Sequence, residues 1–230
     1  LKLINIYGIA SAMSYLHSHN IIHKYLYPTN ILMDYRMFPK IADFQPFNFH
    51  NLIKDALNDS TIIYSAPELY NNQESSKESD VYAFGMIVYS IITNERPFKN
   101  STFSEIQAQV ASGHRPDVPP EIAEPYSKLI EQCWSQESSE RPTFDEITNL
   151  LRNEAGFITD KIDKQEFVNY VEYLDEYQRT HDKSSRGISY EEFIESKMNI
   201  LKKIQKDENE KKFDDKNIIN DLFGNEKDEL

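Results

Sequence analysis

The sequence predicts a mainly α fold with a small β hairpin (α+β), followed by a charged helical tail. Apolar residues recur at helical spacing in several segments, and only two short β-type runs stand close together. All ten prolines lie in residues 1–153, whereas 33 of the 77 later residues are charged, against 30 of the first 153. Proline-punctuated elements are typical of a globular domain, and a proline-free charged stretch of solvated helices or disorder. We therefore predict a domain at 1–153 and a charged helical or partly disordered tail at 154–230.

The first elements follow from local periodicity. Apolar residues from Leu3 to Leu16 fall at helical spacing, and the helix is expected to end near His19 and Asn20. Two short strands are expected next, at 31–33 and 40–42, joined by a turn. A loop-rich stretch follows, from Asp43 to Pro67.

The later elements are helices. Residues Val81–Thr93 carry no charge and are apolar on nearly every side, which is typical of a buried helix. Ser79 or Asp80 is expected to cap its start. The run Glu74–Ser79 before it is expected to be a solvated turn. Further helices are predicted at about 101–112, 122–134 and 143–153.

Charge and cysteine content exclude several classes of protein. The formal net charge of −13 argues against a nucleic-acid or anionic-membrane surface as the main partner. Cys133 is the single cysteine, so no disulfide framework or zinc cluster can form within the chain. No apolar run is long enough to span a membrane. Because the chain starts at Leu1 inside a helical pattern, we expect it to be the C-terminal part of a longer product.

Two motifs carry the information on function. Residues His23–Asn30 read H-K-Y-L-Y-P-T-N, and Asp43-Phe44-Gln45 begins thirteen residues after Asn30. Here the chain resembles the eukaryotic protein kinases, whose catalytic loop reads H-R-D-L-K-P-x-N and whose metal-binding motif reads D-F-G.

Four further matches follow the family's order and spacing, and the last is similar to the tyrosine-kinase-like and tyrosine-kinase groups. They are 16–23, the approach to the catalytic loop; 61–68, the T-x-x-Y-x-A-P-E segment; 80–85, the start of the central helix; and Cys133-Trp134 with 141–144. The resemblance covers the large C-terminal lobe only, since the six glycines form no G-x-G-x-x-G loop. It implies a kinase C-lobe whose small lobe would lie upstream.

The chain departs from the family where the chemistry takes place. The resemblance puts Tyr25 at the position of the catalytic Asp and Tyr27 at that of the catalytic Lys. A carboxylate with a pKa of about 3.9 is a base at neutral pH, whereas a phenol at about 10 is protonated. The resemblance thus implies an impaired catalytic loop. Gln45 also replaces the Gly of D-F-G.

The resemblance implies a residual ligand site. Asn30 and Asp43 match the residues that hold magnesium in the family, and Leu32 matches a residue beneath the adenine ring. In the alternative reading Asn30 satisfies loop backbone groups, Asp43 ends a strand and Leu32 packs in an ordinary core. ATP and Mg²⁺ are expected only if a small lobe lies upstream, and no cofactor is expected for this fragment alone.

Other matching residues have structural roles in the family. His23 and Phe44 match members of a hydrophobic column, and Asp80 matches the Asp that holds the catalytic-loop backbone. Glu68 and Arg141 match a buried ion pair that ties the activation segment to the last helices.

The tail offers two further readings, both discounted. Residues 162–167 and 188–193 resemble the end of a calcium-binding loop, but the preceding ligand positions are mostly unsuitable. Amphipathic helices are expected instead, with Phe167, Val171 and Leu174 in one apolar stripe. The ending Lys227-Asp228-Glu229-Leu230 matches an ER-retention signal. We expect a cytoplasmic protein, with the ER lumen as the alternative.

The favoured interpretation is a pseudokinase that acts as a signalling and interaction module with protein partners. The alternative is an active Ser/Thr or Tyr protein kinase with an atypical catalytic loop, and a third reading is a truncated product without a stable fold. Without a small lobe, apolar residues such as Leu3, Ile6, Leu32 and Phe44 are expected to lie nearer water.

Overall fold

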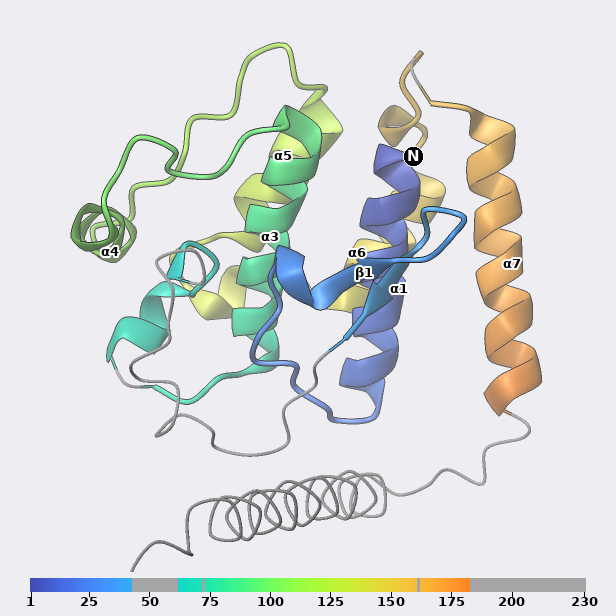
Figure 1. Ribbon diagram of the computed structural model, residues 1–230, viewed down its shortest axis with the longest axis horizontal. Coiled ribbons are helices and arrows are strands. Elements are labelled where there is room, and N and C mark those ends of the chain that lie inside the picture. The colour runs from blue at the N-terminus through green and yellow to red at the C-terminus, as the bar shows by residue number, and fades with distance from the viewer. Residues whose placement is uncertain (43–61, 72, 161, 183–230) are drawn as a thin grey trace, which may run out of the picture. The chain divides into compact units, whose positions relative to one another are not determined.

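A computed structural model of the chain describes residues 1–42, 62–71, 73–160 and 162–182 (Figure 1). The chain divides into two compact units, Leu1–Asp175 and Glu176–Leu230, and the first contains all the packing described below. In the described residues, helices dominate and a single two-stranded sheet is present, as predicted. The predicted division at residue 153 stays a prediction.

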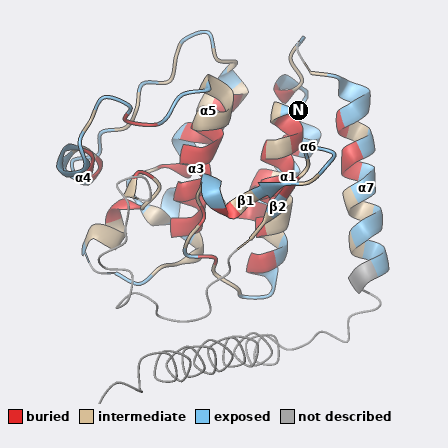
Figure 2. Ribbon diagram, viewed as in Figure 1, coloured by how far each residue is buried: buried red, intermediate tan, exposed pale blue. Residues whose placement is uncertain are grey.

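Helix α1, Lys2–Ser18, is buried on most of its sides because it packs against α6, Phe144–Asn153, and also against β2 and α3 (Figure 2). The expectation that Leu3 and Ile6 lie near water is wrong, since both are fully buried in the core. These side chains point into the lobe itself and do not depend on a further lobe for cover.

The predicted hairpin is present. Strands β1, Ile31–Met33, and β2, Pro39–Ile41, are antiparallel, with Leu32 opposite Lys40. Asp34 Oδ1 shapes the turn by accepting hydrogen bonds from the backbone N–H groups of Arg36 and Phe38, at 2.8 and 2.9 Å.

Helix α3, Lys77–Thr93, is the buried central helix. Its cap is Ser76, not Ser79 or Asp80, because Ser76 and Ser79 form a reciprocal capping box that satisfies both backbone N–H groups. The run predicted to be a solvated turn therefore contains the helix start. Asp80 lies inside the first turn, which leaves its carboxylate available for another partner.

The remaining helices of the kinase-like part match the predicted ranges. They are α4, Phe103–Ala111, α5, Glu124–Cys133, and α6. Short 3₁₀ turns occupy Pro28–Asn30, Pro67–Asn71, Ser138–Glu140 and Ala155–Phe157.

Helix α7, Lys164–Asp182, follows the predicted tail boundary. In the predicted stripe Phe167 and Val171 are buried and Leu174 is half-buried, and Tyr170, which the sequence reading did not include, is buried with them. Asp163 Oδ1 accepts hydrogen bonds from the N–H groups of Gln165 and Glu166, so the first calcium-like motif is the start of a helix. The second such motif and residues 227–230 lie outside the described residues.

None of the described helices is long and apolar enough to cross a bilayer.

Candidate functional site

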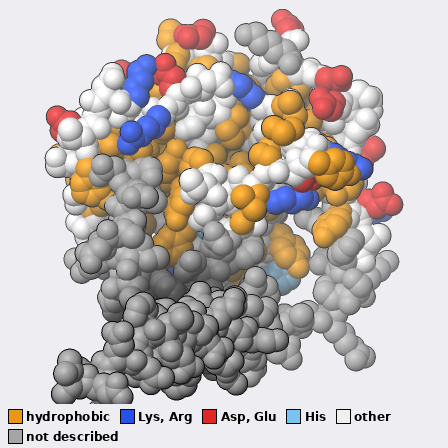
Figure 3. Space-filling model, in the orientation of Figure 1, with side chains coloured by type: hydrophobic (Ala, Val, Ile, Leu, Met, Phe, Trp, Pro, Cys, Tyr) orange, Lys and Arg blue, Asp and Glu red, His pale blue; other side chains and the backbone are white. Residues whose placement is uncertain are grey.

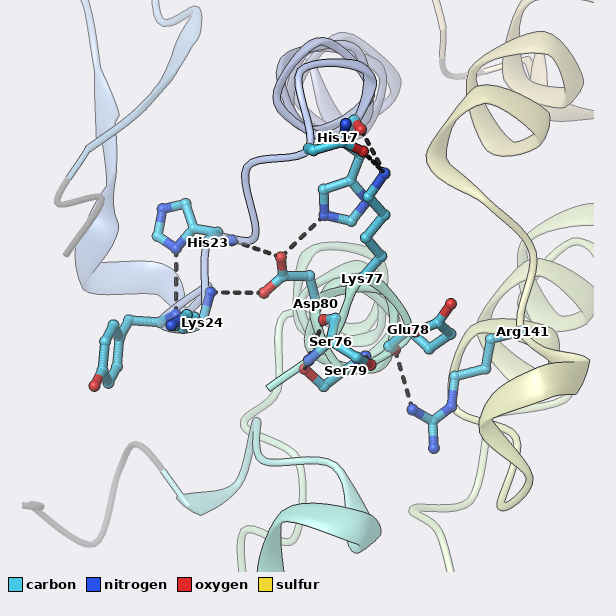
Figure 4. Close-up of polar contacts among 11 residues, drawn as sticks. His17, His23, Lys24, Ser76, Lys77, Glu78, Ser79, Asp80 and Arg141 are labelled. Carbon is cyan, nitrogen blue, oxygen red and sulfur yellow. Dashed lines mark hydrogen bonds and ion pairs between the residues drawn. The ribbon is translucent and has the colours of Figure 1, made fainter. Parts of the chain in front are cut away.

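Asp80 anchors the loop that begins at His23 (Figure 4). Its carboxylate is 2% exposed and accepts hydrogen bonds from the backbone N–H of His23, at 2.7 Å, and of Lys24, at 2.9 Å. His17 Nε2, from α1, lies 3.0 Å from the same carboxylate. A buried carboxylate needs such donors, and here they join α1, α3 and the loop. This is the contact that the kinase resemblance implies for Asp80.

His23 is fully buried and connects the loop to the end of the hairpin. Its Nε2 lies 3.1 Å from the Ala42 carbonyl oxygen, and its Nδ1 accepts a 3.3 Å hydrogen bond from the Tyr25 N–H. This pattern places the proton of a neutral imidazole on Nε2. Lys24, between His23 and Tyr25, has a φ of +71°, which is a left-handed conformation. The hydrogen bond from its backbone N–H to Asp80 holds it there.

Tyr25, which the resemblance assigns to the position of the catalytic Asp, is half-buried. Burial raises the pKa of its phenol above the ordinary value of 10.0, and the neighbouring Tyr27 phenol raises it further. The hydroxyl therefore stays protonated at neutral pH. A protonated phenol is a much poorer proton acceptor than an ionised carboxylate.

Asn30 closes the loop. Its Nδ2 donates to the Tyr25 carbonyl oxygen at 2.8 Å, its N–H donates to the Tyr27 carbonyl oxygen, and its own carbonyl accepts from the Ala42 N–H. Asn30 thus satisfies backbone groups of the loop, which is the structural role that the alternative interpretation gave it. The amide oxygen is the atom suited to a magnesium ion, because Mg²⁺ prefers oxygen ligands.

Asp43 and Phe44, the other residues assigned to the metal site and the hydrophobic column, lie outside the described residues. Within the described ranges, no group of three or more His, Cys, Asp or Glu side chains could hold a metal ion.

Leu32, assigned to the floor of an adenine pocket, is 56% exposed. Met33, Tyr35 and Met37 of the same hairpin are also exposed, and Figure 3 shows hydrophobic side chains on this face of the molecule. The expectation that Leu32 lies near water is confirmed.

Glu68 and Arg141 form the predicted ion pair. Arg141 Nη1 donates to Glu68 Oε1 at 2.7 Å and Nη2 donates to Oε2 at 2.9 Å, with side chains 14% and 0% exposed for Glu68 and Arg141. Arg141 also donates to the carbonyl oxygens of Ser135 and Glu78. The guanidinium therefore connects the segment at Glu68 to α3 and to the turn before α6.

Two residues that contribute to the site, His17 and Lys77, were not predicted from the sequence. His17 contacts Asp80, and Lys77 Nζ donates to the His17 carbonyl oxygen at 2.6 Å and to Asn20 Oδ1 at 3.0 Å (Figure 4). His17 lies within the motif at residues 16–23, but that motif does not indicate that Asp80 is the partner of His17. The Lys77 contact joins residues 60 positions apart and leaves no local signal.

The fold and this loop define the large lobe of a protein kinase. The sequence matches the protein tyrosine and serine/threonine kinase family over residues 2–151, and the chain belongs to that family.

Several curated proteins are similar to the chain. It is 36% identical over 158 residues to a probable LIM domain-containing serine/threonine-protein kinase of Dictyostelium discoideum, covering 68% of this chain and 24% of the relative. It is 38% identical over 150 residues to a probable serine/threonine-protein kinase of the same organism, covering 64% and 16%. A putative serine/threonine-protein kinase/receptor of Acanthamoeba polyphaga mimivirus is 32% identical over 155 residues, covering 65% and 9%. The chain thus spans a quarter or less of these relatives.

Proposed function

We propose that this chain is the large lobe of a pseudokinase, a kinase-fold signalling and interaction module that does not transfer phosphate. The observation that carries the proposal is Tyr25, a half-buried phenol with a raised pKa at the position of the catalytic base. Loss of general-base catalysis alone lowers a rate by about 10²–10⁴. Tyr27 adds to the loss, because a neutral ring stands where the family has a cation.

The preserved scaffold supports a role as an interaction module. Asp80 holds the loop backbone, and Arg141 holds Glu68 with two parallel hydrogen bonds. A folded lobe with altered chemistry can still present a binding surface. The partners that we propose are proteins, and the tyrosine-kinase-like group is the proposed subdivision. The excess of negative charge argues against nucleic acid.

Nucleotide binding belongs to this proposal only in part. We place ATP and Mg²⁺ in the natural protein if a small lobe precedes this chain, with the Asn30 oxygen and Asp43 as magnesium ligands and Leu32 against the base. The exposed Leu32 is compatible with such a position. For the 230 residues alone we propose no cofactor. The proposed compartment is the cytoplasm.

The second candidate is an active protein kinase with an atypical loop. The names of the relatives favour it, since they are described as serine/threonine kinases. What opposes it is the chemistry of Tyr25 and Tyr27 together.

A phosphotransfer assay separates the two candidates. The natural protein, with any region that precedes this chain, is incubated with γ-labelled ATP, Mg²⁺ and general peptide substrates. We expect no transfer above background. Transfer that disappears in an Asn30→Ala/Asp43→Ala variant would overturn the pseudokinase assignment.

A gain-of-function variant tests the reason for inactivity. Tyr25→Asp with Tyr27→Lys restores both side chains of the family motif, and the matched control is Tyr35→Asp at a position that is 87% exposed on the hairpin turn. Measurable transfer in the first variant but not in the control would show that these two side chains limit the chemistry.

A further inference from the structure

Helix α7 belongs to the packed core although it lies beyond the family match, which ends at residue 151. Tyr170 is 3% exposed, and its ring centroid lies 4.4 Å from that of Phe38 and 6.4 Å from that of Tyr7. Phe167 packs edge-on against Tyr7, at 5.5 Å. α7 therefore contacts both α1 and the turn of the hairpin, as Figure 1 shows for its course alongside α1.

Gly8 marks the point where three elements meet. A Cβ at this position of α1 would overlap the Tyr170 hydroxyl and lie 2.7 Å from Pro39 Cγ, at the start of β2. No side chain fits between α1, β2 and α7 without displacing one of them. Tyr170 of α7 and Pro39 of β2 therefore both lie close to Gly8 of α1.

The other end of β2 leads directly to the loop. Ala42, the residue after β2, donates its N–H to the Asn30 carbonyl oxygen at 2.9 Å. Its own carbonyl oxygen lies 3.1 Å from His23 Nε2. Strand β2 thus lies between Phe38, whose ring contacts Tyr170 of α7, and Ala42, which contacts the loop.

We propose that α7 is a control element for the loop His23–Asn30. Docking of Tyr170 against Phe38, the residue before β2, fixes the hairpin, and the hairpin fixes the loop through the two contacts of Ala42, the residue after β2. An ion pair between Arg152 of α6 and Asp175 helps to hold α7 in the docked position. Release of α7 frees the hairpin and loosens the loop. Because such coupling is reciprocal, a ligand that orders the loop tightens α7 in turn.

The test is amide hydrogen exchange on the full chain in wild type and in Tyr170→Ala. The reporting amides are Ala42 and Asn30, each of which donates a hydrogen bond within the loop region. The reference amides are Asn94 and Trp134, which donate to carbonyls of α3 and α5. We expect exchange at Ala42 and Asn30 to rise by about five- to 150-fold, the usual range of such coupling, with the reference amides unchanged.

Two further variants make the result specific. Tyr177→Ala makes the same change at a half-exposed position of the same helix and should leave the four amides as in wild type. Asp175→Asn removes the ion pair with Arg152 and keeps every aromatic ring, so this variant can be used if Tyr170→Ala does not fold. We expect Asp175→Asn also to raise exchange at Ala42 and Asn30.

Two results would overturn the proposal. In the first, α7 amides exchange faster while Ala42 and Asn30 do not, which would show that α7 docks independently of the loop. In the second, all amides accelerate equally, which would show global destabilisation without specific coupling.

Discussion

Arg141→Ala is the sharpest test of how this lobe is held together. The substitution removes a guanidinium that is fully buried and that makes two hydrogen bonds to Glu68 and three more to backbone carbonyl oxygens, those of Ser135, Gln136 and Glu78. Glu68 is left with a carboxylate that is 14% exposed and has lost its cation. Breaking a buried pair in this way costs about 3–5 kcal/mol of the free energy of unfolding, because the remaining charge stays desolvated.

That free energy converts into a large shift in thermal unfolding. For a chain of 150–250 residues, 1 kcal/mol lowers the melting temperature by about 2–4 °C. We therefore expect Arg141→Ala to lower the melting temperature of the full chain by about 6–20 °C, as measured by circular dichroism or calorimetry.

A surface ion pair provides the matched control. Lys128 and Glu124 are also joined at 2.7 Å, but their side chains are 66% and 75% exposed. Lys128→Ala should leave the melting temperature almost unchanged, because an ion pair in water contributes little to stability. A double-mutant cycle of Arg141→Ala with Glu68→Ala should show strong coupling. Equal melting curves for Arg141→Ala and Lys128→Ala would refute the assignment of Glu68 and Arg141 as a stabilising pair.

Three further predictions concern packing, capping and pH. Gly85→Ala should destabilise the chain by about 1–3 kcal/mol in urea unfolding, because the new Cβ would lie 2.8 Å from Cys133 Cβ; an unchanged midpoint would contradict the close contact of α3 with α5. Ser76→Ala should cost about 0.5–2 kcal/mol in the same assay through loss of the α3 cap, and Ser75→Ala, one residue earlier, should cost less. Burial raises the pKa of several tyrosines above 10.0, so their stabilising effect is complete below pH 10 and is lost as the pH rises beyond it, because the unfolded chain ionises first. In an absorbance titration these tyrosines should ionise together with unfolding, and independent ionisation near pH 10 would contradict their burial; they are Tyr70, Tyr82, Tyr126 and Tyr170.

The periodicity of apolar residues was sufficient to locate the helices of the predicted domain, but the predicted cap of α3 was wrong. The apolar run at 81–93 identifies the buried helix, but α3 begins at Lys77. The first turn of α3 is polar because Ser76 and Ser79 cap it and Asp80 binds the loop. A pattern of apolar residues therefore cannot locate the start of this helix. The exposure of Leu3 and Ile6 was misjudged for a related reason: the sequence shows which residues are apolar but not which neighbour covers them.

The tail was predicted only in its local pattern. Phe167 and Val171 mark an apolar stripe, and spacing alone places them on one face of a helix. That Tyr170 joins them depends on Gly8 and Phe38, more than 130 residues away in the chain. Tyrosine is common on surfaces as well as in cores, so its burial could not be inferred from the residue type.

The site contacts explain how the kinase-like loop keeps its shape independently of the side chains at Tyr25 and Tyr27. Asp80 binds the backbone N–H groups of His23 and Lys24, and Asn30 binds the backbone carbonyl of Tyr25. None of these contacts uses the side chain of Tyr25 or Tyr27. Since the loop is held through its backbone, the side chains of Tyr25 and Tyr27 stand in it without disturbing the interactions that fold it.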